Sequence, residues 1–162
     1  MCRNHRYKWV VFGTDWEGMS FVDVPTALRV FLTDLSAFRT VPERTSQAFV
    51  NKAVMLRTMR GRLASDEVLM SSTGSPIVAA NAEVVYMGNS QGAILGGGYT
   101  AMSTDLRRVV LGETGANYAL ILSRSVDFAT YYAVLQLQVY SQRDVRLMLT
   151  VVRAGEGGAH IV

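Results

Sequence analysis

Five residues near the middle of the chain, Gly88-Asn89-Ser90-Gln91-Gly92, have the spacing G-x-S-x-G. This spacing is typical of a nucleophile elbow, a sharp turn between a strand and a helix that exposes a serine hydroxyl. Because the turn is strained, small residues are expected two positions before and two positions after the serine. Ser90 would attack a carbonyl carbon, and the backbone N–H of Gln91 would donate to the developing oxyanion. The motif therefore predicts Ser90 as a nucleophile and Gln91 as an oxyanion donor.

The residues on either side of the motif are those that an elbow needs. The apolar stretch Ala82–Gly88 predicts a buried strand, and Gln91–Ser103 predicts a helix despite its glycines. Gly92 and Gly96 fall on one face of that helix, where they would let it lie close to the sheet. Each glycine costs about 1 kcal/mol of helix propensity relative to Ala, and close packing would offset this cost. The alternative is a glycine-rich strand–helix turn with an incidental serine.

Two further segments have the pattern of strands. Lys8–Gly13 is short, β-branched and aromatic, as a buried parallel strand should be, and Arg107–Glu113 follows the expected helix. Strands that alternate with helices favour an α/β protein. We therefore predict one domain over residues 1–162, with a partial parallel sheet of about three strands and flanking helices.

The sequence indicates the helices with unequal clarity. Thr40 and Glu43 have capping-box spacing at the start of a helix, and Gly61 is its expected stop. The stretch Val24–Phe38 fits a short helix or a surface excursion, and Tyr118–Val152 is mostly helical in pattern. The face predicted for the helix before Gly61 consists of Phe49, Ala53, Leu56 and Arg60, with Val50, Val54 and Met55 beside it.

Composition excludes several classes of function. The chain of 162 residues has one cysteine, Cys2, so neither an intrachain disulfide nor a cysteine-based zinc site can form. The net charge of +3 is scattered, and the densest basic cluster (Arg57, Arg60 and Arg62) lacks the interleaved aromatics of a nucleic-acid surface. No apolar run approaches the roughly 18 residues that span a bilayer. Met19 stands where a P-loop needs its lysine. We expect a soluble chain, cytoplasmic as it stands, without metal, cofactor, nucleic acid or membrane span.

Three segments resemble the α/β-hydrolase superfamily, especially its esterase- and lipase-like members. They are GNSQGAILGG, which is similar to the elbow and its helix, YKWVVFGTDWEGMS, and RRVVLGETGANYALILSRSVDF. The resemblance covers roughly Tyr7 to Phe128. It implies hydrolysis of a small-molecule carboxylic ester, with Ser90 as the nucleophile.

The chain departs from that family where the rest of a catalytic triad is needed. A working member requires a histidine base, an acid and a second oxyanion donor, which would precede Tyr7. The histidines are His5, which precedes the first strand, where no triad histidine belongs, and His160, a candidate base or a solvated tail residue. Glu113 is a candidate acid or an ordinary polar loop residue. We therefore expect the middle of a longer hydrolase, cut at both ends, whose base and acid are not identifiable in this span.

Other polar residues have structural interpretations. Asp15 is expected in a loop or turn and Asp127 at a helix cap. Trp16 is expected to pack, with lining of a pocket as the alternative.

The resemblance also raises a question of topology. In the family, a further strand lies between the two that correspond to Lys8–Gly13 and Ala82–Gly88. Without it, these strands must pair directly, leave a gap or accept a strand from another chain. The alternative function is therefore an inactive remnant or a self-associating α/β binding module, with a homo-oligomer formed through an unpaired sheet edge.

Overall fold

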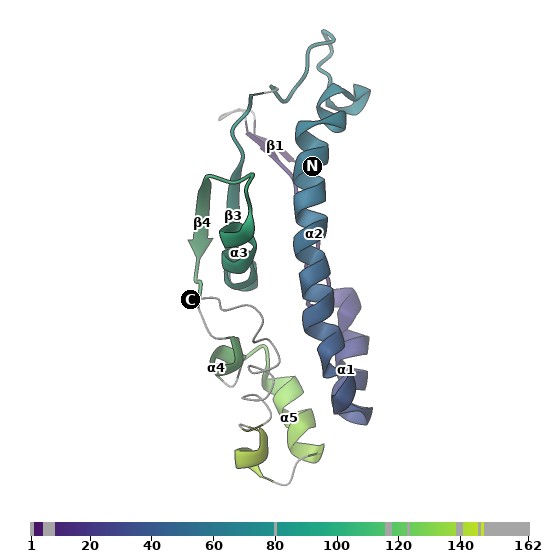
Figure 1. Cartoon of the computed structure of the whole chain (residues 1–162), viewed down its shortest axis with the longest axis vertical. Helices are drawn as coiled ribbons and strands as arrows, with labels where there is room; N and C mark the ends of the chain where they lie inside the picture. The colour runs from purple at the N-terminus through teal and green to yellow at the C-terminus, as the bar shows by residue number, and fades with distance from the viewer. Residues whose placement is uncertain are drawn as a thin grey trace.

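The computed structural model describes residues 2–4, 9–79, 81–115, 118–122, 124–138, 141–145 and 147. The long helix α2 (Thr40–Arg60) runs beside a unit made of β3 (Val85–Asn89), α3 (Gln91–Met102) and β4 (Arg108–Gly112) (Figure 1). The helix α1 (Val24–Thr33) contacts α5 (Ala129–Gln138). The described part mixes helices with a small parallel sheet, as expected for the general α/β class.

The parallel sheet consists of β3 (Val85–Asn89) and β4 (Arg108–Gly112), joined by α3 (Gln91–Met102). The strands are in parallel register from Val85 opposite Arg108 to Asn89 opposite Gly112. The predicted strand–helix–strand succession is confirmed here, with boundaries that differ by three residues at most. The prediction that the first of these strands is buried is wrong: Met87 is 79% exposed, and Gly88 is the one buried residue of β3. A parallel pair needs a crossover connection, and α3 supplies it.

The prediction for Lys8–Gly13 is wrong in its pairing. The strand β2 (Trp9–Val11) pairs antiparallel with β1 (Cys2–Asn4) in a sheet of its own. Trp9 and Val11 are 52% and 58% exposed, so β2 is no buried central strand. Only four residues separate β1 from β2, and such a local pairing has a small loop-closure cost. The described residues thus hold two parallel strands rather than three.

The two strands of the topological question do not pair directly, since β2 and β3 belong to separate sheets. On the side away from β4, no described strand pairs with β3. The edge of β3 is therefore open within the part of the chain that the structure describes.

The helix α2 has the predicted span, Thr40–Arg60, and Gly61 follows it as the C-cap. The predicted capping box of Thr40 and Glu43 is wrong. A 3₁₀ helix, η2 (Leu35–Arg39), runs directly into α2, so that Thr40 is already helical. The helical run is capped further upstream, where Asp34 Oδ1 accepts from the N–H of Ser36 at 2.9 Å.

The buried face of α2 also differs from the prediction. It consists of Ala48, Lys52, Leu56 and Met59, of which the predicted face contained Leu56 alone. The sequence favoured a face of apolar residues, but the structure buries a lysine in it and leaves Val50 and Val54 exposed.

A run of aromatic rings joins α2 to the β3–α3–β4 unit. Trp16 meets Phe49 with ring centroids 5.7 Å apart, Phe49 meets Tyr99 at 6.2 Å, and Tyr99 meets Tyr86 at 5.9 Å. Because aromatic pairs stabilise beyond their buried area, this run fixes α3 relative to α2.

The remaining elements are short. The stretch Val24–Phe38, predicted as a short helix or a surface excursion, forms α1 and most of η2. The helical pattern predicted after Tyr118 is confirmed over α4 and α5. The tail from residue 148 onward lies outside the described residues. The other elements are η1 (Phe21–Asp23), η3 (Arg62–Ser65), η4 (Glu67–Leu69), α4 (Tyr118–Leu122) and α5 (Ala129–Gln138).

Candidate functional site

Ser90 lies at the turn between β3 and α3 and has φ 50° and ψ −120°. A residue with a side chain adopts such a backbone conformation at a cost of about 1–3 kcal/mol. The conformation is held from both sides. The N–H of Ser90 donates to the carbonyl of Gly112 at 2.9 Å, and its own carbonyl accepts from Ala93 and Ile94 at 2.9 and 3.0 Å. The turn thus has the strained geometry that the G-x-S-x-G spacing predicts, and Ser90 is exposed.

The glycines around the turn allow close backbone contact, but not all as predicted. A Cβ at Gly88 would overlap the backbone of Gly92, and a Cβ at Gly96 would overlap the ring of Tyr86. The Tyr86 hydroxyl also donates to the carbonyl of Gly92 at 2.6 Å. A Cβ at Gly92 would meet nothing within 4 Å, so its predicted need for a small side chain is wrong. The glycines that the close approach of α3 to β3 requires are therefore Gly88, at the end of the strand, and Gly96, one turn beyond Gly92 in the helix.

Gln91 is the first residue of α3. Within the described part of the chain, the backbone N–H groups of Gln91 and Gly92 donate to no acceptor. Such free N–H groups and the positive end of the helix dipole favour a negative charge at this point. The side chain of Gln91 points elsewhere, since its Nε2 donates to the carbonyl of Met19 at 3.2 Å.

The loop that contains Met19 is fixed on α2. Gly18 has φ 85°, and a Cβ there would lie 2.7 Å from the carbonyl oxygen of Val41. Lys52, 5% exposed, reaches from α2 and donates to the carbonyl oxygens of Thr14 and Asp15 at 3.2 and 3.1 Å. The loop from Gly13 to Ser20 is thereby held next to the elbow.

Trp16 packs in this loop, as predicted. Its ring lies edge-on to Phe49, and the Lys52 ammonium is 3.8 Å from the ring centroid. Burial lowers the pKa of Lys52, and the nearby Asp15 carboxylate opposes that shift. Asp15 itself lies in the loop, as expected.

A buried carboxylate organises the end of the same loop. Asp23 is 4% exposed, and its Oδ2 accepts from the N–H of Gly18 at 2.8 Å and the hydroxyl of Ser20 at 2.6 Å. Its Oδ1 accepts from Nε and Nη2 of Arg44 at 2.9 and 2.6 Å. Burial acts to raise the pKa of Asp23, but the hydrogen bonds from Ser20 and Arg44 outweigh it and hold that pKa below its ordinary value.

Neither Asp23 nor Lys52 is among the residues that the sequence motifs indicate. The signal for Asp23 was present, because Ser20 and Asp23 have S-x-x-D spacing and form a capping box. Lys52 offered a weaker signal: it stands at helical spacing between the buried residues Ala48 and Leu56.

Glu113 lies at the same edge of the sheet as Ser90. It follows β4 directly, is exposed and has φ 54°. Asn89 Nδ2 approaches its Oε2 at 3.4 Å. The structure thus brings Glu113 beside the end of β3.

The other candidates are Asp127 and the two histidines. Asp127 lies in the turn before α5, which begins at Ala129. Its predicted role as a helix cap stays a prediction. His5 and His160 both lie outside the described residues, so the described part contains no histidine.

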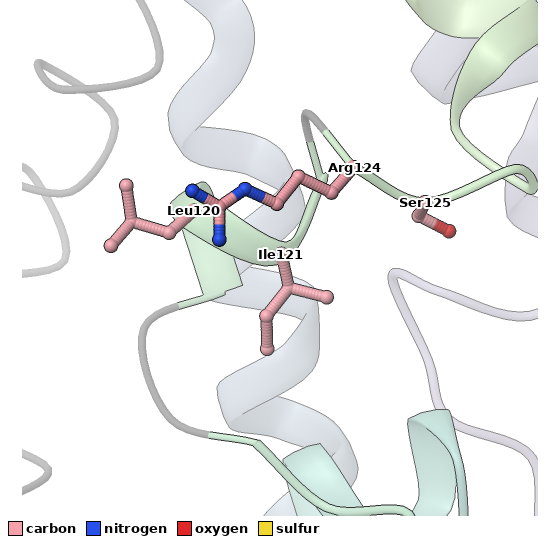
Figure 2. A pocket seen from close by; sticks show the side chains of 4 residues that line it. All are labelled: Leu120, Ile121, Arg124 and Ser125. Carbon is pink, nitrogen blue, oxygen red and sulfur yellow. The ribbon is translucent and has the colours of Figure 1, made fainter.

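Two hollows on the surface of the described residues are lined by residues other than Ser90. One, of about 440 Å³, is bordered by Leu120, Ile121, Arg124 and Ser125. Figure 2 shows the Arg124 guanidinium reaching back toward Leu120, above the side chain of Ile121. The other, of about 190 Å³, lies between α2 and α3 around Phe49, Arg57, Tyr99 and Met102. The described residues bring no three metal-binding side chains together. Every helix within the described ranges is too short or too polar to cross a bilayer.

Comparisons of the chain with protein-family models, with curated proteins and with solved structures found no match. What the chain does is therefore inferred from the geometry at Ser90 and from the residues that hold it.

Proposed function

We propose that the chain carries the nucleophile site of a serine hydrolase that acts on carboxylic esters, with Ser90 as the nucleophile. The observation that supports this most directly is the backbone of Ser90, with φ 50° and ψ −120° between a parallel strand and a helix. A strained residue of this kind persists only where its surroundings over-determine it, and such residues cluster at functional sites. A glycine would relieve the strain, yet the position holds a serine.

The proposed reaction starts at the exposed hydroxyl. Ser90 Oγ forms a bond to the ester carbonyl carbon while its proton passes to a base. The carbonyl oxygen becomes an oxyanion and accepts from the free N–H of Gln91 at the positive end of α3. The C–O bond to the alcohol then breaks, the alcohol takes the proton, and water later releases the acyl group from Ser90.

A histidine base would come from outside the described residues, which contain no histidine. His160 or a histidine of a neighbouring chain would serve. Glu113, exposed at the same sheet edge as Ser90, lies where an acid could orient such a base.

Turnover of 4-nitrophenyl butyrate by the purified chain tests this function. We expect Ser90→Ala to lower kcat/KM by at least about 10³-fold, as removal of an activated nucleophile does. Ser46→Ala is the matched control, because Ser46 is an exposed serine whose hydroxyl donates only to its own helix, at Pro42. Equal turnover by Ser90→Ala and wild type would overturn the proposal.

The second candidate is a non-catalytic α/β module that has the elbow but no triad. Two observations favour it: the described residues contain no histidine, and β3 has an open edge among them. An unassisted serine hydroxyl is a poor nucleophile at neutral pH. A folded chain without ester turnover that self-associates in size-exclusion chromatography would point to this function.

A further inference from the structure

One peptide group connects the buried carboxylate to the elbow. The N–H of Ser20 donates to Asp23 Oδ2 at 3.1 Å, and the carbonyl of Met19 accepts from Gln91 Nε2 at 3.2 Å. Because the peptide bond is planar, this N–H and this carbonyl belong to one rigid unit and point in opposite directions. Asp23 and Gln91 therefore hold the two ends of the same peptide group.

The Asp23 end of this arrangement is firmly fixed. The carboxylate accepts five hydrogen bonds, two of them from Arg44 and three from the Gly18–Ser20 turn. A buried charge is tolerated only when it is paired and hydrogen-bonded, so loss of any partner is costly. The turn cannot move without giving up contacts to a carboxylate that is 4% exposed.

The Gln91 end lies one residue after Ser90. A hydrogen bond from a peptide N–H to a carboxylate polarises the peptide group and strengthens its carbonyl as an acceptor. The Met19 carbonyl is thus a good partner for Gln91 Nε2. An anchored side chain restricts the backbone of the first residue of α3, whose N–H is the proposed oxyanion donor.

We propose that Asp23 is a positioning residue for the Ser90 elbow, acting through the Met19–Ser20 peptide and the Gln91 side chain. The consequence for catalysis rests on the proposed function, since it requires an oxyanion at the Gln91 N–H. The mechanical coupling between Asp23 and the elbow does not.

A double-mutant cycle tests the coupling. The variants are Asp23→Asn, which removes the charge, Gln91→Met, which removes the donor at similar size, and their combination. The first readout is amide hydrogen exchange of peptides over residues 88–94, compared with peptides of α2. We expect Asp23→Asn to speed exchange at the elbow several-fold more than in α2, and to add nothing in the Gln91→Met background, because both act through one contact.

The second readout is the rate at which a fluorophosphonate probe labels Ser90. We expect each single variant to lower the labelling rate by about tenfold, because the Gln91 N–H is no longer held in place. The double variant should lower the rate no further, since both changes act through the same N–H. Asp34→Asn is the matched control. Asp34 also accepts from the N–H and hydroxyl of a nearby serine, Ser36, but it is exposed and has no contact to the elbow. It should change neither readout at the elbow.

The outcomes separate the two proposals. Unchanged exchange at the elbow in Asp23→Asn, or effects that add in the double variant, would overturn the positioning role. If Asp23→Asn does not fold, Arg44→Lys replaces it in the cycle, because it weakens the hold on the carboxylate but keeps the charge. Absence of labelling in wild type, together with coupled exchange, would overturn the serine hydrolase and leave the positioning of the elbow standing.

Discussion

Ser90 and Glu113 both have a positive φ angle, 50° and 54°, and each directly follows the last paired residue of one of two adjacent parallel strands. In the part of the chain that the structure describes, they are the two residues other than glycine with positive φ. The N–H of Ser90 donates to Gly112, the residue before Glu113. Strain is thus concentrated at the carboxyl edge of the sheet, where ligands of α/β proteins bind.

The strain at Ser90 can be measured through stability. Replacement by glycine relieves about 1–3 kcal/mol of backbone strain but gives up about 0.4–1 kcal/mol through the more flexible unfolded chain. We therefore expect Ser90→Gly to unfold in urea with a free energy about 1 kcal/mol above wild type, and Ser90→Ala to stay near wild type. A Ser90→Gly variant less stable than Ser90→Ala would show that the turn is not strained.

Two neighbouring glycines of α3 should respond in opposite ways to alanine. A Cβ at Gly96 would overlap the Tyr86 ring, and overpacking of this kind costs about 1–3 kcal/mol. A Cβ at Gly97 would make an ordinary contact, 3.9 Å from Leu111 Cδ1, so the gain in helix propensity of up to about 1 kcal/mol should prevail. Thermal unfolding should rank Gly97→Ala at or above wild type and Gly96→Ala below it. The reverse order would contradict the packing of α3 on β3.

The Asp23 carboxylate should make the free energy of unfolding depend on pH. Its pKa is held below the ordinary value of about 3.9, so its contribution is present above that value and is lost as pH falls through the lower, folded-state pKa. The difference in unfolding free energy between wild type and Asp23→Asn should therefore be greatest above about pH 5 and should narrow toward pH 2. Chemical denaturation at a series of pH values measures it. A difference that stays constant would show that the charge of Asp23 is not what stabilises the turn.

Local patterns predicted the order of elements in the β3–α3–β4 unit, but not the exposure of β3. An apolar run, a strained turn and a helix follow one another within Ala82–Ser103, and each is specified by residues close in sequence. The pairing of β2 was not predictable in this way, because the run Lys8–Gly13 contains nothing that selects its partner strand. The same holds for the buried face of α2, where a loop far away in the sequence provides the acceptors for Lys52.

In the candidate site, too, local features were predictable and contacts between distant segments were not. Ser90, Gln91 and the edge position of Glu113 followed from a motif and the order of strands. The contact between Gln91 and Met19 did not, because it joins residues that tertiary packing alone brings together. Asp23 was detectable as a capping box with Ser20, but its role in the turn beside the elbow depends on where that turn lies.

The most direct test of the central claim is labelling of the purified, folded chain with a fluorophosphonate probe, read by intact mass and peptide mapping. An activated serine should give one adduct at Ser90 that is absent from Ser90→Ala and retained in Ser46→Ala. Labelling at that position would mean that a base reaches Ser90. A His160→Ala variant, and labelling at dilutions that separate neighbouring chains, would then identify where the base comes from. A folded chain that remains unlabelled, or labelling that persists in Ser90→Ala, would contradict the assignment of Ser90 as a catalytic nucleophile.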